Sequence, residues 1–171
     1  MMETSEKDSA LSVLNLIASL SRDRHLRAAG IPVSQREIRL DGISVLLVDD
    51  SADNRMLVEL FLKTAGASVA TAKNGQEALL KLKEAHYNAV LMDIQMPVMD
   101  GYEATAQLRR EGNDIPIVAL TAHAMKEERK RCLQSGFNAH LGKPIDRQEL
   151  LRQLAAISYS AGRGSGGDSL Y

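Results

Sequence analysis

The sequence predicts an α/β domain whose parallel sheet is covered by helices on both faces. Five short strand-like runs, each bounded by turn residues, are typical of strands that are buried on both faces of such a sheet. Segments in which apolar residues recur at helical spacing alternate with these runs. Because strand–helix units follow one another along the chain, we expect parallel strands with helices packed on both faces.

The first two strand–helix units occupy residues 43–83. Ser44–Val48 predicts the first strand, and apolar residues within 56–61 recur at helical spacing before Gly66 ends that helix. Ser68–Ala72 predicts the second strand. An Asn-Gly pair follows it and opens a predicted helix over Gln76–Lys83.

The remaining three units repeat this order. Their predicted elements are the strand Ala89–Met92, a helix from about Gly101 to Arg110, the strand Ile117–Leu120, a helix from about Lys126 to Gln134, the strand Ala139–Leu141 and a helix over Asp146–Ile157. Gly112 and Gly136 are stop signals for the first two of these helices. Residues 43–157 therefore predict a single domain of five strands and five helices.

Two extensions flank this predicted domain. Residues 1–42 form the first, in which Ser5 and Asp8 are typical of a capping box for a helix from about Glu6 to Ala29, followed by a linker. Two interpretations of that helix stay open: it packs against the domain or frays as a linker, or it is a dimerisation or docking helix. Residues 158–171 are rich in Ser and Gly, which predicts a flexible tail.

Composition excludes several classes of protein. The formal net charge of −1 gives no electrostatic reason for binding to nucleic acid or to acidic membranes. The single cysteine, Cys132, excludes an intrachain disulfide. The start lacks a secretory signal, and its apolar stretch Leu11–Leu20 is too short to span a bilayer. We therefore expect a soluble, cytoplasmic protein that contacts neither nucleic acid nor membrane.

Chemically capable residues stand at or just after the ends of four predicted strands. They are Asp49 and Asp50 after the first strand, Asp93 after the third, Thr121 after the fourth and Lys143 after the fifth. In an open α/β sheet the ligand site lies outside the carboxyl ends of the strands, so these side chains are expected to gather at one edge. Three carboxylates there repel one another, which favours a divalent cation. Mg²⁺ prefers carboxylate and phosphate oxygens and is the expected cofactor.

The same residues favour phosphoryl transfer. Lys143 supplies a positive charge and Thr121 supplies a hydroxyl donor for a phosphoryl group. The sequence lacks a P-loop, a dinucleotide-binding glycine motif and a serine nucleophile elbow. A carboxylate is therefore the available nucleophile, and its product would be an aspartyl phosphate.

Four motifs resemble, in order, the signatures of two-component response regulator receiver domains. They are Val48–Ser51, Leu91–Gly101, Ala119–Ala122 and Gly142–Ile145, and the similarity runs from about Ile43 to Ile157. Asp53–Arg55 and Met96–Gly101 further resemble the receivers of hybrid sensor histidine kinases and phosphorelay proteins. The resemblance implies a flavodoxin-like (βα)5 doubly wound sheet of order 2-1-3-4-5, here with an extra N-terminal helix.

The resemblance also implies roles for the acidic residues. Asp93 would accept a phosphoryl group from the phosphohistidine of a histidine kinase or a histidine phosphotransfer protein. Asp50 and Asp93 would bind Mg²⁺ directly, together with the backbone carbonyl of Gln95. Asp49 would complete the acidic pocket and bind the ion through water.

Thr121 and Lys143 would contact the phosphoryl group itself. Thr121 would hydrogen-bond to it when the domain switches, and Lys143 would pair with its oxygens. The peptide bond between Lys143 and Pro144 is expected to be cis, as is usual in the family. The switch is expected to reach the face formed by the helix Lys126–Gln134, the strand Ala139–Leu141 and the last helix.

Two histidines differ from the pattern of the family. His140 stands three residues before Lys143, where the family usually places a Tyr or Phe that moves inward on activation. It is either a half-exposed histidine without a switching role, or a residue that follows Thr121 inward and makes the switch sensitive to pH. His123 is either an exposed loop residue or a modulator of dephosphorylation.

Alternatives to a receiver cut from a hybrid kinase also stay open. The chain could be a free-standing single-domain response regulator, or a pseudo-receiver scaffold, although the intact set of five residues argues against a scaffold. A Mg²⁺-dependent phosphohydrolase also forms an aspartyl phosphate, but such enzymes usually carry a second carboxylate where this chain has Gln95. We expect a phosphoacceptor signalling domain, not a metabolic enzyme, in the cytoplasm or in the cytosolic part of a membrane-bound kinase.

Overall fold

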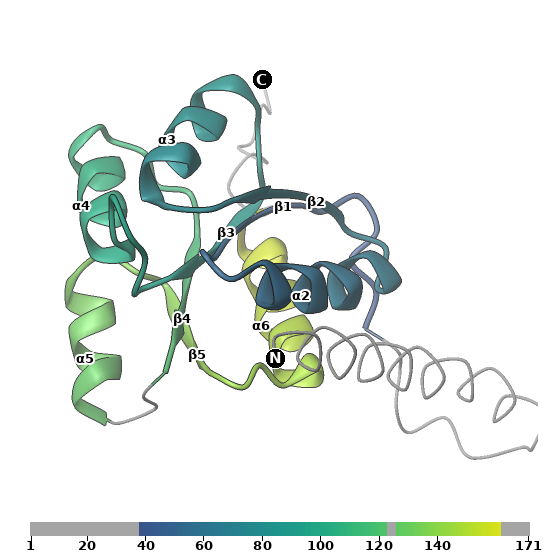
Figure 1. Ribbon diagram of the computed structural model, residues 1–171. Coiled ribbons are helices and arrows are strands. Elements are labelled where there is room, and N and C mark those ends of the chain that lie inside the picture. Colours follow the sequence, from purple (N-terminus) through teal and green to yellow (C-terminus); the bar gives the residue numbers. More distant parts are fainter. Residues whose placement is uncertain (1–37, 123–125, 162–171) are drawn as a thin grey trace, which may run out of the picture. The chain divides into compact units, whose positions relative to one another are not determined.

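Five parallel strands form one sheet in the order β2-β1-β3-β4-β5 (Figure 1). The computed structural model describes residues 38–122 and 126–161. The strands are β1 (Ser44–Val48), β2 (Ser68–Ala72), β3 (Ala89–Asp93), β4 (Ile117–Thr121) and β5 (Ala139–Gly142). The helices are α2 (Ala52–Thr64), α3 (Gly75–Glu84), α4 (Gly101–Arg110), α5 (Lys126–Gln134) and α6 (Arg147–Ala161). The predicted fold class and strand order are confirmed.

Local capping explains where three of the helices begin. The side chains of Ser51 and Asn74 accept hydrogen bonds from backbone N–H groups in the first turns of α2 and α3. Asp100 and Glu103 form a reciprocal capping box at the start of α4. Each of these caps directly follows a strand or its loop, so the helices start close to the carboxyl edge of the sheet.

Helices cover both faces of the sheet, with α3, α4 and α5 on one side and α2 and α6 on the other (Figure 1). On the first side, buried residues of β1, β3 and β4 pack with apolar residues of the three helices, among them Leu46, Met92, Ala119, Leu79 and Leu108. The alternate residues of the strands are buried too, including Val45, Leu47, Leu91 and Leu120. A sheet buried on both faces needs near-continuous apolar strands, which is the pattern of this sequence.

The structure differs from the sequence-based boundaries at the two ends of the domain. Leu40 is buried, and its N–H donates to the Ala65 carbonyl oxygen at 2.7 Å, so residues just before β1 pack against the end of α2. The last helix continues to Ala161, four residues beyond the predicted end at Ile157. The expected N-terminal helix, His123 and residues 162–171 lie outside the described residues.

Candidate functional site

The strand order brings the chemically capable residues to one edge of the sheet. β1 lies between β2 and β3, and β4 and β5 follow on the β3 side. Asp49 and Asp50 come directly after β1, Asp93 and Thr121 are the last residues of β3 and β4, and Lys143 comes directly after β5. The chain reverses its direction of winding between β1 and β3, and open α/β sheets bind ligands at such a switch point.

A single ammonium group joins two of the carboxylates. Lys143 Nζ lies 2.8 Å from Asp49 Oδ2 and 2.8 Å from Asp93 Oδ2. Asp49 is 1% exposed and Asp93 is 6% exposed, so both ion pairs are largely removed from solvent. The Lys143 side chain therefore spans the space between the ends of β1 and β3.

The three carboxylates also fit a divalent metal ion. One oxygen from each of Asp49, Asp50 and Asp93 can be chosen so that all three lie within 4.8 Å of one another. Three carboxylates against the one ammonium of Lys143 leave a formal charge of −2, which one divalent cation would neutralise. Oxygen donors of this kind are the ligands that Mg²⁺ prefers.

Protein donors hold Asp49 and Asp93 differently from Asp50. Asp49 accepts hydrogen bonds from the Ser51 N–H at 2.9 Å and from the Asn54 side-chain amide at 3.3 and 3.4 Å. Asp93 Oδ1 accepts from the Gln95 N–H at 3.3 Å. Asp50 is exposed, and no described residue donates a hydrogen bond to its carboxylate. Asp50 therefore offers the carboxylate that is most available to an ion arriving from solvent.

Charge and burial shift two pKa values in the site. Burial raises the pKa of the Asp93 carboxyl, and the nearby Asp49 carboxylate adds to this, while the Lys143 ammonium opposes it less strongly. Burial lowers the pKa of the Lys143 ammonium, but its hydrogen bonds to Asp49 and Asp93 more than offset this, so its pKa is raised. Lys143 is thus firmly protonated, whereas ionised Asp93 carries an electrostatic penalty in the metal-free site.

The other predicted site residues lie around this cluster. Thr121 is buried at the end of β4, and its carbonyl oxygen accepts from the Lys143 N–H at 2.7 Å. The Lys143–Pro144 peptide bond is cis. Gln95 is exposed two residues beyond Asp93. Thr121, Pro144 and Gln95 therefore lie at or just beyond the ends of the strands that carry the site.

His140 lies farther from the cluster, on the half-buried part of β5. It lines a groove of about 400 Å³ between α5, β5 and α6, with Arg129, Glu149 and Gln153 among the other lining residues. Burial, and then the positive charge of Arg129, lowers the pKa of the His140 imidazole. Protonation of the ring therefore requires a lower pH than for an imidazole in water.

Sequence reasoning missed two features close to the site. The Arg55 guanidinium donates to the backbone carbonyls of Asp49 and Asp50. Val98 takes a left-handed φ of 72°, and the Met99 N–H donates to the Pro97 carbonyl oxygen at 2.9 Å, which closes a tight turn. Arg55 belongs to a motif recognised in the sequence, but the motif alone does not tell where its side chain goes.

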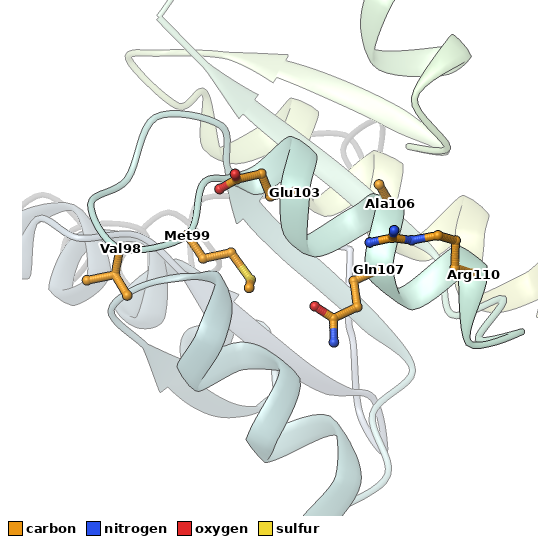
Figure 2. A pocket seen from close by; sticks show the side chains of 6 residues that line it. All are labelled: Val98, Met99, Glu103, Ala106, Gln107 and Arg110. Carbon is orange, nitrogen blue, oxygen red and sulfur yellow. The ribbon is translucent and has the colours of Figure 1, made fainter.

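The Val98 turn also borders a surface pocket away from the acidic cluster. Figure 2 shows this pocket, of about 530 Å³, lined by Val98 and Met99 of the turn and by Glu103, Ala106, Gln107 and Arg110 of α4. None of the three site aspartates lines it. The pocket therefore lies apart from the acidic cluster at the strand ends.

Residues 45–155 match the family of response regulator receiver domains, which covers more than half of the chain. The chain belongs to this family. A sensor protein, GacS of Pseudomonas syringae pv. syringae, is 41% identical over 140 residues, which are 78% of this chain and 15% of that protein. The chain therefore spans only a small part of the length of this curated relative.

Solved receiver structures resemble the domain closely. The receiver domain of a sensor histidine kinase from Pseudomonas aeruginosa, solved with a magnesium ion coordinated in its active-site cleft, is 39% identical with a TM-score of 0.64, over 69% of this chain and 98% of that one. The receiver domain of Saccharomyces cerevisiae Ssk1, solved with the histidine phosphotransfer protein Ypd1, is 31% identical with a TM-score of 0.68, over 72% and 94% of the two chains.

Among residues 38–122 and 126–161, none of the receiver's helices is both long enough and apolar enough to cross a membrane.

Proposed function

We propose that this receiver domain is a Mg²⁺-dependent phosphoacceptor that takes a phosphoryl group on Asp93. The observation that carries the proposal is the cluster itself: Asp93 shares the Lys143 ammonium with Asp49, and Asp50 completes a set of three carboxylates. A nucleophilic carboxylate, a fixed cation and an oxygen-lined ion site are together the components that phosphoryl transfer to aspartate requires.

In the proposed reaction, Asp93 is the nucleophile. One oxygen of its carboxylate forms a bond to phosphorus while the phosphorus–nitrogen bond of a phosphohistidine breaks. The donor imidazole keeps the electron pair of that bond and takes a proton from solvent. Lys143 already contacts Asp93 at 2.8 Å, so its ammonium can pair with the arriving phosphoryl oxygens without a large movement.

Asp50 and Asp93, with the Gln95 carbonyl, would hold the Mg²⁺ ion directly, and Asp49 would hold it through water. When bound, the ion neutralises negative charge on the phosphoryl oxygens. Asp49 is suited to the indirect position because its oxygens already accept hydrogen bonds from Ser51, Asn54 and Lys143. The exposed Asp50 is suited to the direct position.

Thr121 is the proposed link between the phosphoryl group and the rest of the domain. Its hydroxyl would bond to the group, and the movement would reach the groove between α5, β5 and α6, in which His140 lies. Such a contact exists only in the phosphorylated state, so it can shift an equilibrium between two conformations.

We further propose that the domain comes from a hybrid sensor histidine kinase, with a histidine kinase or histidine phosphotransfer protein as its donor, and that it acts in the cytoplasm. The sensor-protein relative and the complex between Ssk1 and Ypd1 support this origin and this class of partner. The alternative of a free-standing regulator would have the same site. A phosphohydrolase is disfavoured by the family match and by the amide of Gln95 where such enzymes use a carboxylate.

Incubation with acetyl phosphate tests the phosphoacceptor function. Intact mass after incubation with Mg²⁺ should increase by one phosphoryl group, and the gain should be absent in Asp93→Asn and without metal. Transfer from a phosphorylated histidine phosphotransfer protein would be measured in the same way. Failure of both donors to phosphorylate the folded chain would contradict the proposal, and a gain of mass in Asp93→Asn would place the acceptor elsewhere.

A further inference from the structure

Arg55, in the first part of α2, reaches back to the turn that carries two of the site aspartates. Its Nη1 atom lies 2.6 Å from the Asp49 carbonyl oxygen and 3.0 Å from the Asp50 carbonyl oxygen. Arg55 is half-buried, and neither contact involves a carboxylate. One guanidinium nitrogen therefore fixes two successive peptide groups between β1 and α2.

These contacts matter most for Asp50. Asp49 is held by side-chain bonds to Ser51, Asn54 and Lys143 as well as by its backbone. No described residue donates to the Asp50 carboxylate, so the position of that carboxylate depends on the backbone from which it projects. Two neighbouring carbonyl oxygens pointing at the same place repel each other unless a donor lies between them. Arg55 is that donor.

We propose that Arg55 is a positioning residue for metal binding, which presets the Asp50 carboxylate by holding the Asp49 and Asp50 carbonyls. The inference rests on the proposed function of the site. Residues that orient metal ligands without touching the ion change metal affinity by about 10–100-fold when they are mutated. Arg55 would thus affect the affinity for Mg²⁺ without contacting the phosphoryl group.

Electrostatics alone predicts that replacing Arg55 tightens Mg²⁺ binding, whereas loss of the positioning contacts predicts weaker binding. A guanidinium near the acidic cluster repels a divalent cation, so removing its charge without any loss of position would tighten Mg²⁺ binding. Loss of position weakens binding. A residue needed only for the stability of α2 would lower the melting temperature and leave the Mg²⁺ affinity of the folded chain unchanged.

The experiment compares Mg²⁺ binding by the full chain with Arg55→Met, Arg55→Lys and Arg55→Gln by titration calorimetry. Arg152→Met is the matched control, because Arg152 is an exposed arginine whose described partners, Gln148 and Glu149, lie on α6 itself. We expect the Kd to rise about tenfold in Arg55→Met and Arg55→Gln, to rise less in Arg55→Lys, and to stay unchanged in Arg152→Met.

The rate of phosphorylation by acetyl phosphate supplies a second measurement. In Arg55→Met the half-saturating Mg²⁺ concentration should rise by the same factor, while the rate at saturating Mg²⁺ stays close to that of the unmodified chain. Unchanged or tighter Mg²⁺ binding in a folded Arg55→Met or Arg55→Gln variant would overturn the inference. Absence of Mg²⁺ binding by the unmodified chain would instead contradict the proposed function.

Discussion

Lys143 determines the electrostatic balance of the site, because its one ammonium is shared by two buried carboxylates. Burial raises the pKa of the Asp93 carboxyl, and the neighbouring Asp49 carboxylate adds to this, so the pKa is raised although the Lys143 ammonium lies 2.8 Å away and opposes the shift. In the metal-free domain, the ionised form of Asp93 is therefore less favourable in the folded state than in the unfolded chain. The ionised carboxylate of Asp93, the proposed phosphoacceptor, therefore lowers the stability of the metal-free domain.

Replacing the Asp93 carboxylate by a neutral amide should stabilise the metal-free domain. We expect Asp93→Asn to increase the free energy of unfolding at pH 7 by about 1 kcal/mol, which lies within the usual range for stabilising substitutions. An amide keeps the oxygen that accepts from the Gln95 N–H. Urea denaturation in the presence of a chelator measures the difference. Asp53→Asn is the control, since this exposed carboxylate in the first turn of α2 favours the helix and its loss should not stabilise.

The pH dependence of this difference has a definite sign. As pH falls through the raised pKa of Asp93, the folded chain binds a proton before the unfolded chain does, and the unmodified domain gains stability. The advantage of Asp93→Asn should therefore shrink from pH 7 toward the ordinary aspartate pKa near 4. An advantage that grows on acidification, or a less stable variant at pH 7, would contradict the electrostatic account.

The site residues that could be predicted from sequence are those that end a strand or closely follow its end. Asp50, Asp93 and Lys143 could be placed together because the carboxyl ends of parallel strands meet at one edge. The hydrogen-bond acceptors of Arg55 could not be predicted, because a long side chain can reach several acceptors and the sequence pattern does not show which one it contacts. The Tyr102 hydroxyl, which donates to Glu128 of α5 at 2.6 Å, depends likewise on helix packing between α4 and α5.

At the scale of elements, the start of α4 is packed tightly against the end of β3. Gly101 is buried, and its N–H donates to the Ile94 carbonyl oxygen at 2.9 Å. A Cβ at this position would overlap the backbone carbonyl oxygen of Asp93. The start of α4 therefore lies so close to the end of β3 that only glycine fits at position 101.

Gly101→Ala should consequently destabilise the domain by about 2 kcal/mol, within the range for overpacking. Gly112→Ala is the comparison: a Cβ there meets no atom within 4 Å, but the φ of +75° is strained for alanine and costs about 1 kcal/mol. Urea denaturation ranks the two variants. A larger loss in Gly112→Ala than in Gly101→Ala would show that the backbone near Asp93 can move aside.

Most element positions could be predicted because each apolar run is short and because α2, α3 and α4 each begin after a capping residue. The end of α6 could not, because apolar spacing stops near Ile157 while the helical backbone continues to Ala161. Met56 shows the limit of the pattern in α2: it matches the helical spacing, yet 55% of its surface is exposed. Periodicity finds the helix but not the width of the face that the sheet covers.

At the scale of the whole molecule, the proposed metal site lies where the ends of β1 and β3 meet. An ion that binds only the folded arrangement adds its binding free energy to the stability of the complete domain. The three carboxylates come from two strand ends separated by a helix, a strand and a further helix along the chain, so the unfolded chain cannot reproduce the site.

Mg²⁺ should therefore raise the melting temperature of the chain. At a concentration 100 times the Kd, the gain is about 2.7 kcal/mol, which corresponds to roughly 10 °C for a domain of this size. Scanning calorimetry with Mg²⁺ and with a chelator measures it. The shift should be lost in Asp50→Asn and kept in Asp53→Asn. An equal shift in Asp50→Asn would exclude Asp50 as a ligand.

The packing of α5 against α4 gives the molecule a chemical reporter. Cys132, the single cysteine of the chain, is 0% exposed, and burial raises the pKa of its thiol, so it is protected from alkylating reagents. The Tyr102 hydroxyl lies 3.6 Å from the Cys132 sulfur, so movement of α5 away from Tyr102 would expose the sulfur to a reagent. The rate of thiol alkylation, measured before and after phosphorylation, would thus follow the opening of this side of the domain without any introduced label.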